Sequence, residues 1–229
     1  MAGVVHVVIP AYNEAGSIHR VVEAIPKNIA SVIIVVNNGS TDNTAAVARD
    51  AGALVVDEPR RGYGQACLAG IAASRQHTPT PDIVVFIDGD FSDYPEEMVM
   101  LIKPIVDDEA DLVIGSRTLG QREKGAMTIQ QTFGNWLATA LIRLFFGVRF
   151  TDLGPFRAIR GSTLNALGMR DTTYGWTVEM QIKAAKQKLR VLEVPVRYRR
   201  RIGKSKISGT LKGTLLAGYK ILFTVFRYI

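Results

Sequence analysis

Ile-Val-Val-Phe-Ile-Asp-Gly-Asp-Phe-Ser-Asp-Tyr-Pro forms residues 83–95 and carries the clearest indication of the fold. Its first five residues, 83–87, are apolar and predict a buried strand that runs directly into the carboxylates of Asp88 and Asp90. Open α/β sheets bind ligands at the carboxyl edge of their strands, and hard divalent cations prefer oxygen ligands. Gly89 lacks a Cβ atom, so a ligand can approach the backbone closely there. The segment favours a cation and diphosphate site, and an ordinary Asp-Gly turn is the alternative for this segment alone.

The rest of the first 115 residues alternates between strand and helix patterns. Such alternation predicts a mostly parallel sheet, flanked by helices and joined by right-handed crossovers. Ser40 or Thr41 is the expected N-cap of the second helix. The expected strands are 4–9, 32–36, 53–56, 83–87 and 112–114, and the expected helices are 18–25, 40–51, 65–74 and 95–106.

Beyond residue 115 the pattern changes, although no repeat or low-complexity linker separates the two parts. A strongly apolar helix is expected over 133–146, a strand over 191–198 and an amphipathic helix from residue 211 to the C-terminus. The apolar side of the 133–146 helix is expected to hold Trp136, Leu137, Ala140, Leu141, Leu144 and Phe145. A chain of 229 residues suits one domain with a large core, so residues 1–229 are interpreted as a single domain with halves 1–115 and 116–229.

Composition narrows the class of protein. Cys67 is the only cysteine, which excludes a disulfide framework and fits a reducing compartment. The N-terminus is interpreted as a first strand rather than a signal peptide, because no basic segment precedes its apolar run. No apolar run reaches the roughly 18–20 uncharged residues needed to span a bilayer, so contact with a membrane is expected at its surface only.

The net charge of +7 is concentrated near the C-terminus, where Glu193 is the only acid from Arg190 onward. Such a basic segment favours an anionic partner, either a phosphate substrate, an anionic lipid surface or nucleic acid. A solvated basic face is the alternative. Tyr198 is the only aromatic residue among these basic residues before Tyr219. Few aromatic rings are therefore available to stack on bases, and nucleic acid is not an expected partner.

Motifs at other strand ends extend the first observation. Two clusters of polar and turn-forming residues, 10–14 and 37–42, follow the first two expected strands. Each alone is an ordinary turn, but three strand ends with such clusters produce the crevice that a ligand requires. The chain has no Walker loop, and Cys67 replaces the third glycine of a dinucleotide fingerprint that starts at Gly62, which argues against a dehydrogenase.

Together these segments resemble family 2 glycosyltransferases of the GT-A fold, with a Rossmann-like central sheet. The segments that carry this resemblance are Pro10–Glu14, Gly39–Asp42, Arg61–Gly64 and Asp88–Asp90. Later segments are similar to the polyprenyl-phosphate sugar synthases, among them the dolichyl-phosphate mannose and glucose synthases. These segments are Gly115–Arg117, Asp152–Ala158, Trp176–Met180, Glu193–Pro195 and Arg200–Lys206. The resemblance runs from residue 4 to about residue 220.

The resemblance implies a role for each matching residue, with 1–115 as the half that binds the nucleotide sugar and 116–229 as the half that binds the acceptor. Residues implied for nucleotide-sugar binding are Pro10, Tyr12, Glu14, Val36, Asn38, Gly62, Asp88, Gly89 and Asp90. Asp88 and Asp90 are the implied ligands of a Mg²⁺ or Mn²⁺ ion, with Asp90 the principal one. The implied catalytic set is Asp88, Asp90, Arg117, Arg200 and Lys206. The implied acceptor and phosphate contacts are Arg117, Gln131, Glu179, Arg200 and Lys206.

The chain departs from the family pattern at three places. Asn37-Asn38 stands where an Asp-Asp pair is common, which puts the nucleotide preference in question. Gln130 and Gln131 replace basic residues, so an acceptor phosphate depends more on Arg117 and the basic C-terminal segment. Glu179 is followed by methionine rather than by the aspartate of transferases that act on hydroxyl groups. Glu179 is either an orienting residue for acceptor or sugar, or a surface residue of a helix.

The resemblance implies a metal-dependent, inverting transfer of a hexose from a nucleotide sugar to a polyprenyl or dolichyl phosphate. UDP-glucose is the favoured donor, because 152–155 and 174–177 look like the glucose synthases, and GDP-mannose is the alternative. A phosphate monoester has a second pKa of about 6, so it is largely dianionic at neutral pH and needs no general base. A transferase for sugar hydroxyls and a non-catalytic binding module are the competing interpretations.

A polyprenyl chain also requires an apolar surface beside the site. The expected helices 133–146 and 211–226 can supply it by lying in the membrane interface, with basic residues toward anionic head groups. Packing against the sheet is the alternative for the first of them. The protein is therefore expected in the cytoplasm, as a peripheral protein on the inner face of the membrane.

Overall fold

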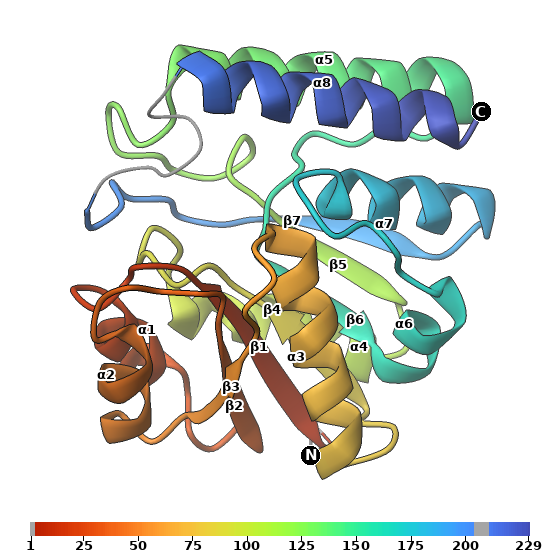
Figure 1. The fold of residues 1–229 in the computed structure, drawn as a ribbon. Helices are drawn as coiled ribbons and strands as arrows, with labels where there is room; N and C mark the ends of the chain where they lie inside the picture. The colour runs from red at the N-terminus through yellow and green to blue at the C-terminus, as the bar shows by residue number, and fades with distance from the viewer. Residues whose placement is uncertain (1–2, 204–210) are drawn as a thin grey trace.

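In a computed structural model of the chain, which describes residues 3–203 and 211–229, a seven-stranded sheet has the strand order β3-β2-β1-β4-β6-β5-β7 (Figure 1). The strands are β1 (Val5–Ala11), β2 (Val32–Asn37), β3 (Leu54–Asp57), β4 (Ile83–Phe86), β5 (Leu112–Ser116), β6 (Arg157–Arg160) and β7 (Val191–Pro195). β6 runs antiparallel to β4 and β5, whereas the other pairings are parallel. The predicted α/β class with a mostly parallel sheet is therefore confirmed.

Helices flank the sheet on both faces. They are α1 (Ile18–Ala24), α2 (Thr44–Asp50), α3 (Tyr63–His77), α4 (Met98–Val106, after the 3₁₀ turn η1, Pro95–Glu97), α5 (Ile129–Phe146), α6 (Gly161–Leu167), α7 (Trp176–Lys186) and α8 (Leu211–Arg227). The predicted cap of α2 is wrong, because its N-cap residue is Asn43. The Ser40 hydroxyl accepts a hydrogen bond from the Asn13 amide, and the Thr41 amide donates to the Asn13 side chain, so both tie the ends of β1 and β2 together.

Strand β6 was not predicted, because its four residues begin and end with arginine rather than forming an apolar run. Arg157 is nonetheless fully buried, and its guanidinium donates to the backbone carbonyls of Leu153, Gly154 and Thr177. Burial lowers the pKa of Arg157 to about 10. Hydrogen bonds to these carbonyl oxygens thus offset the cost of burying the charged guanidinium within the sheet.

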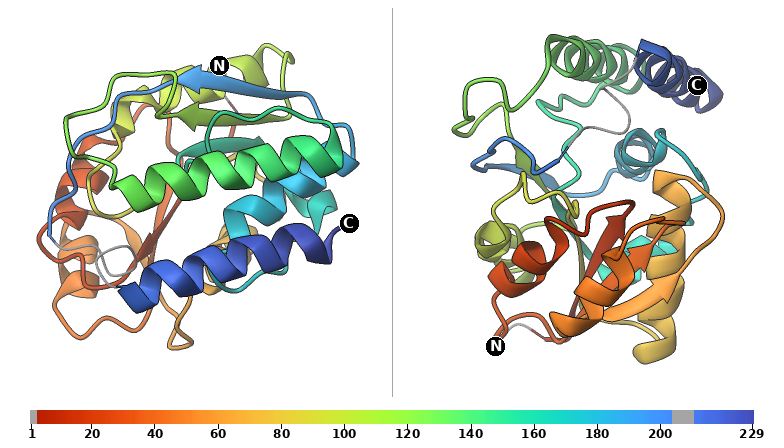
Figure 2. Two further views of the ribbon diagram at one scale, coloured as in Figure 1. Left: turned by 90° about the horizontal axis from the view of Figure 1, so that it is seen from above. Right: turned by 60° about the vertical axis from the view of Figure 1, so that its left-hand side comes forward.

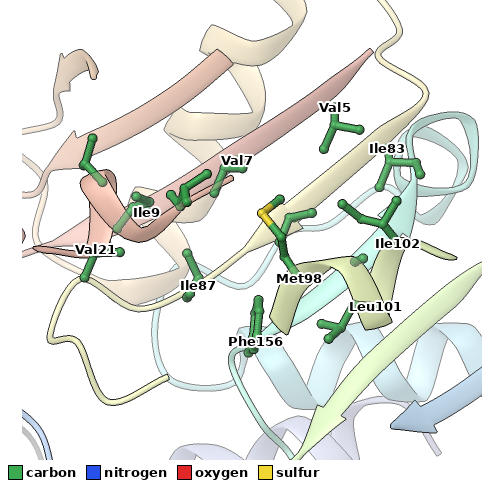
Figure 3. Close-up of a cluster of buried hydrophobic side chains, with 14 of the residues drawn as sticks. Val5, Val7, Ile9, Val21, Ile83, Ile87, Met98, Leu101, Ile102 and Phe156 are labelled. Carbon is green, nitrogen blue, oxygen red and sulfur yellow. The ribbon is translucent and has the colours of Figure 1, made fainter. Parts of the chain in front are cut away.

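The core has two layers, one on each face of the sheet. Val5, Val7 and Ile9 of β1 point toward α1 and α4, where they pack in one apolar cluster with residues such as Met98 (Figure 3). Val8 points to the opposite face and belongs to the second cluster, with residues of α3 and α7. This division follows from the two-residue repeat of a strand, which sends successive side chains to opposite faces.

Helices α5 and α8 form an outer layer on the side of the molecule away from the N-terminus (Figure 1). They lie side by side and run in the same direction, as the view from above also shows (Figure 2), and the rings of Phe145 and Phe226 are 5.7 Å apart. Within residues 3–203 and 211–229, no helix combines the length and the apolar character that crossing a membrane requires.

The predicted apolar side of α5 is only partly its packed side. Its buried residues are Asn135, Ala138, Thr139 and Ile142. Four residues of the predicted apolar side, Trp136, Ala140, Leu144 and Phe145, are instead exposed. The helix is therefore apolar on both its inner and its outer surface, a property that a single packing interface does not require.

Candidate active site

A pocket of about 340 Å³ opens where β1, β2 and β4 end, and we call it the sheet-edge pocket. The ends of these strands supply most of its floor, and the start of α3 supplies one side. The segment 173–174 and Arg201 reach it from the second half of the chain. Its lining is Pro10, Ala11, Tyr12, Glu14, Asn38, Arg61, Gly62, Tyr63, Ala66, Asp88, Gly89, Asp90, Thr173, Tyr174 and Arg201.

The pocket gathers the residues that the resemblance assigned to nucleotide-sugar binding, with one exception. Pro10, Tyr12, Glu14, Asn38, Gly62, Asp88, Gly89 and Asp90 all line it. Val36 does not, because its side chain points from β2 into the fully buried cluster beneath α3. Val36 lies within β2 and packs in the core, whereas Asn38 follows the last residue of that strand and reaches the pocket.

The two carboxylates of the Asp-Gly-Asp segment are held differently. Asp88 accepts a hydrogen bond from the Tyr63 hydroxyl at 3.1 Å through Oδ1. Asp90 accepts one from the Ser92 amide at 2.9 Å through Oδ1, while its Oδ2 lies 3.3 Å from Nη1 of Arg201. Burial, and then the charge of Asp90, raises the pKa of Asp88. A nearby cation therefore favours the charged form of this pair.

The donor set of the pocket fits a hard cation that arrives with a phosphate ligand. Among the described residues, no group of three or more His, Cys, Asp or Glu side chains is arranged to enclose a metal ion. Mg²⁺ is commonly bound by one or two carboxylates together with substrate phosphates and water, rather than by a cage of protein ligands. Asp88 and Asp90 supply that smaller set at the wall of an open pocket.

Arg201 is one of the pocket residues that the sequence interpretation did not assign, together with Ala11, Arg61, Tyr63, Ala66, Thr173 and Tyr174. The Arg201 guanidinium bonds to Glu14 at 2.9 Å and also contacts Asp90, so it connects the ends of β1 and β4. The resemblance assigned the phosphate contact to its neighbour, Arg200. Its backbone amide instead donates to Glu123 and its side chain to the carbonyl of Lys124.

Alternation along an extended segment explains the difference between neighbouring arginines. Arg199 donates to the carbonyls of Phe91 and Asp93, and Arg201 contacts Asp90, so both face the loop that follows β4. Arg200, between them, faces the opposite way. The run of three arginines was a visible signal, but the choice among them depended on which face meets β4.

Asn38 organises one wall of the pocket with all of its side-chain polar atoms. Its amide nitrogen donates to the carbonyls of Glu58 and Arg60, at 3.0 and 2.7 Å, and its oxygen accepts from the Gly62 amide at 2.8 Å. A carboxylate cannot donate to those two carbonyls. Asn38 can therefore hold the loop of residues 58–62 in a way that the aspartate common at this position cannot.

The start of α3 is fitted tightly against the segment 171–173. A Cβ atom at Gly64 would lie 2.1 Å from the Asp171 carbonyl oxygen, and one at Gly62 would lie 2.2 Å from that of Thr172. Gly62 also has φ +151°, a conformation that other residues rarely adopt. These two glycines therefore allow the backbone at the start of α3 to lie close to the backbone of residues 171–172. Thr173 and the Tyr12–Arg61 contact consequently lie at the same pocket.

Arg117 lies beside the pocket but outside its lining. Its guanidinium forms a two-pronged contact with the fully buried Asp152, at 2.9 and 2.6 Å, and lies over the ring of Tyr198. Asp93 is buried nearby, and neither of its carboxylate oxygens has a hydrogen-bond partner among the described residues. Burial is the main cause that raises the pKa of Asp93, so its protonated form is favoured.

The remaining predicted acceptor residues lie elsewhere. Gln131 forms a reciprocal capping box with Thr128 at the start of α5. Glu179 is fully buried and accepts a hydrogen bond from the hydroxyl of Tyr228 at 2.6 Å, so it is neither a pocket residue nor a surface residue of a helix. Lys206 lies outside the described residues.

The seven-stranded sheet with carboxylates at its edge has the architecture of the GT-A fold. Glucosyl-3-phosphoglycerate synthase of Mycobacterium tuberculosis, solved with Mn²⁺, UDP-glucose and phosphoglyceric acid, matches the fold with a TM-score of 0.78 at 23% identity. The match covers 99% of this chain and 79% of that one.

The sequence gives the family directly. The family described as "Glycosyl transferase family 2" matches residues 6–168, and the chain belongs to it. The chain is therefore a glycosyltransferase, and it is related to enzymes that transfer sugars to polyprenyl phosphates.

Three relatives illustrate this kinship. An uncharacterised glycosyltransferase of M. tuberculosis H37Rv is 38% identical over 95% of this chain and 96% of its own length. The undecaprenyl-phosphate mannosyltransferase of Micrococcus luteus is 30% identical, over 90% of this chain and 88% of its own length. The UDP-N-acetylglucosamine–dolichyl-phosphate N-acetylglucosaminyltransferase of Methanococcus voltae is 28% identical, over 84% of both chains.

Proposed function

We propose that the protein transfers a hexose, with inversion, from a nucleotide sugar to a polyprenyl or dolichyl phosphate, and that UDP-glucose is the preferred donor. The observation that carries the proposal is the sheet-edge pocket, where Asp88 and Asp90 lie beside the cation of Arg201, which contacts Asp90. This arrangement suits a diphosphate held between a metal ion and a guanidinium.

The nucleobase and the diphosphate of the donor are assigned to two different parts of the pocket. Tyr12 and Arg61 form a flat contact, with the guanidinium carbon 3.3 Å from the ring centre, against which a nucleobase can stack. Asp88, Gly89 and Asp90 then face the diphosphate. The glucosyl-3-phosphoglycerate synthase of similar fold was solved with Mn²⁺ and UDP-glucose, which supports both the donor and the cofactor, Mg²⁺ or Mn²⁺.

In the proposed reaction, an oxygen of the acceptor phosphate attacks the anomeric carbon while the bond from that carbon to the nucleoside diphosphate breaks. When bound, the metal ion would offset the charge that develops on the leaving diphosphate. Arg201 supplies a fixed cation for the same charge, and its contact with Glu14 holds it in place. The acceptor phosphate keeps no proton that a general base must remove.

The acceptor is supported by the relatives and by the state of Glu179. Two relatives act on lipid phosphates, as their names state. Glu179 has all the features of a structural carboxylate, because it is buried and bonded to the Arg170 and Asp171 amides and to Tyr228. A general base for a sugar hydroxyl is therefore not supplied by this residue, whereas a phosphate acceptor does not need one.

The acceptor half, 116–229, is proposed to meet the membrane through the α5–α8 layer. Exposed large apolar residues on this layer include Phe133, Trp136, Leu144, Tyr219, Phe223 and Phe226. Such a surface suits a polyprenyl chain and the membrane interface. We propose a peripheral protein on the cytoplasmic face of the membrane.

The test is release of nucleoside diphosphate by the purified protein, with UDP-glucose or GDP-mannose, with and without Mg²⁺ or Mn²⁺, and with and without undecaprenyl phosphate. Release that requires both metal and lipid phosphate is the expected result. Asp90→Asn should lower the rate by roughly 10²–10³-fold, because a positioned charge is lost at the diphosphate. Asp50→Asn, at the exposed end of α2, is the matched control.

Other outcomes are equally informative. Turnover with sugar acceptors and none with the lipid phosphate would support the transferase for hydroxyl groups instead. Metal-dependent donor binding without turnover on any acceptor would support the binding module.

A further inference from the structure

A second hollow, separate from the sheet-edge pocket, runs along one flank of α5, and we call it the α5 groove. It has a volume of about 760 Å³ and shares no lining residue with the sheet-edge pocket. Its walls come from α5, from residues 118–122 and from residues 149–151. The two loop segments flank α5 in the sequence as well as in space.

Three arginines line the groove, namely Arg122, Arg143 and Arg149. None of the three forms an ion pair with a carboxylate within the described ranges 3–203 and 211–229, and no Asp or Glu lines the groove. Many other arginines of the molecule do have such partners, for example Arg190 with Asp108 and Asp111. The groove thus concentrates positive charge that the described protein leaves unbalanced.

The groove also has an apolar margin. Trp136 and Leu144 line it and are 62% and 73% exposed, and both belong to the outward surface of α5. Asn135, Thr139 and Thr132 add polar groups between the apolar and the charged residues. A ligand that fits this arrangement has an anionic head and an apolar part that continues along α5.

We propose that the α5 groove binds the phosphate headgroup of an anionic membrane phospholipid, which is not a reactant. Guanidinium groups bind phosphate oxygens in pairs, and clustered basic residues beside an apolar helix surface are typical of anionic lipid binding. The groove would hold the protein on the membrane in one orientation, with the outer surface of the α5–α8 layer against the lipid.

This inference goes beyond the proposed reaction. The groove contains neither of the two carboxylates of the sheet-edge pocket, and Arg117, which is predicted to handle the acceptor phosphate, is turned toward Asp152 rather than into the groove. Lipid binding at the groove can therefore be measured with no donor, no metal and no acceptor present.

The experiment compares sedimentation with vesicles of phosphatidylcholine alone and of phosphatidylcholine with phosphatidylglycerol. The double variant Arg143→Gln/Arg149→Gln should lose roughly 30-fold in partition onto the anionic vesicles, at the usual contribution of each basic residue near such a surface. The control is Arg20→Gln/Arg75→Gln, which removes the same charge from exposed positions on α1 and α3. The control should lose less than about 3-fold, because its charges lie on α1 and α3, away from the α5–α8 layer.

Tryptophan fluorescence gives an independent readout. The chain has two tryptophans, and Trp176 is fully buried, so Trp136 alone should respond when lipid enters the groove. Brominated lipid acyl chains should quench the wild-type protein, and Trp136→Phe should abolish most of that quenching.

Two results would overturn the proposal. Equal losses in the two double variants would show that only net charge attracts the protein to the vesicles. Saturation of the groove by inorganic phosphate, measured as loss of anionic-vesicle binding at low millimolar concentration of that ion, would make it a site for a soluble anion instead.

Discussion

Arg201 in the sheet-edge pocket is paired with Glu14 and Asp90, whereas Arg143 and Arg149 in the α5 groove have no carboxylate partner among the described residues. Both regions gather arginine, the residue best suited to phosphate. The first holds its cation in place before a ligand arrives. The second leaves its cations on long side chains at the surface.

The difference indicates two kinds of anion binding. A preorganised cation stabilises charge that develops during a reaction, because no reorganisation is needed at that moment. Unpaired surface arginines are suited to a ligand that supplies the missing charge and is not transformed. The sheet-edge pocket thus fits chemistry and the α5 groove fits attachment, and four substitutions sharpen or break that contrast.

The largest effect is expected at Arg117, which lies between the two regions. Arg117→Gln leaves the fully buried Asp152 without its cation, and such a loss costs roughly 3–5 kcal/mol of unfolding free energy. Urea denaturation measures it. Arg190→Gln is the control, since the contacts of that exposed arginine with Asp108 and Asp111 are screened by water and should contribute little to stability. Equal losses in the two variants would mean that the Arg117 pair is not buried in solution.

The next effect separates two neighbouring arginines. Arg201→Gln should reduce nucleoside diphosphate release by roughly 10²-fold, because a fixed cation beside Asp90 is lost. Arg200→Gln should change the rate by less than about 3-fold, since its side chain is bound to the Lys124 carbonyl at the surface. The reverse order of effects would restore the role that the resemblance gives to Arg200.

A smaller effect is expected at Asn38, inside the wall of the sheet-edge pocket. Asn38→Asp removes the donors to the Glu58 and Arg60 carbonyls and sets a charge against them, at a cost of roughly 1–3 kcal/mol. Thermal unfolding and nucleotide affinity should both decline. Asn165→Asp at an exposed position, where the side-chain oxygen accepts from Arg75, should leave both nearly unchanged.

The smallest effect tests how α8 is attached to the rest of the protein. Tyr228→Phe removes the hydrogen bond to buried Glu179 and should cost about 1.5 kcal/mol, the lower end for a bond to a charged group, because the tyrosine is partly exposed. Tyr219→Phe, on the exposed side of α8, is the control and should be neutral. Thermal unfolding compares them, and an unchanged melting temperature in Tyr228→Phe would mean that α8 is held by apolar packing alone.

Much of the sheet-edge pocket could be predicted, because it depends on patterns of residues that are neighbours in the sequence. A strand of apolar residues that ends in polar ones predicts both the sheet and the edge at which Asp88, Asp90 and Asn38 gather. The mostly parallel α/β fold and the family are confirmed in this way. The site roles of the residues stay predictions until substitution tests them.

The acceptor side was less predictable because its features depend on distant segments. Glu179 is placed by the loop at 170–171 and by Tyr228, near the other end of the chain, and no spacing near Glu179 reveals either contact. The strand β6 was missed because it begins with a charged residue, Arg157, whose burial depends in part on the carbonyl of Thr177 in α7.

The sequence alone determined the alternation of strands and helices, the polar strand ends and the family, since each depends on residues that are neighbours along the chain. The tertiary structure decided that Arg201 rather than Arg200 faces Asp90, and that Arg122, Arg143 and Arg149 share one groove. The physical reason is that a side chain acquires its partners only when separate segments of the chain pack together, and no local pattern fixes which faces will meet.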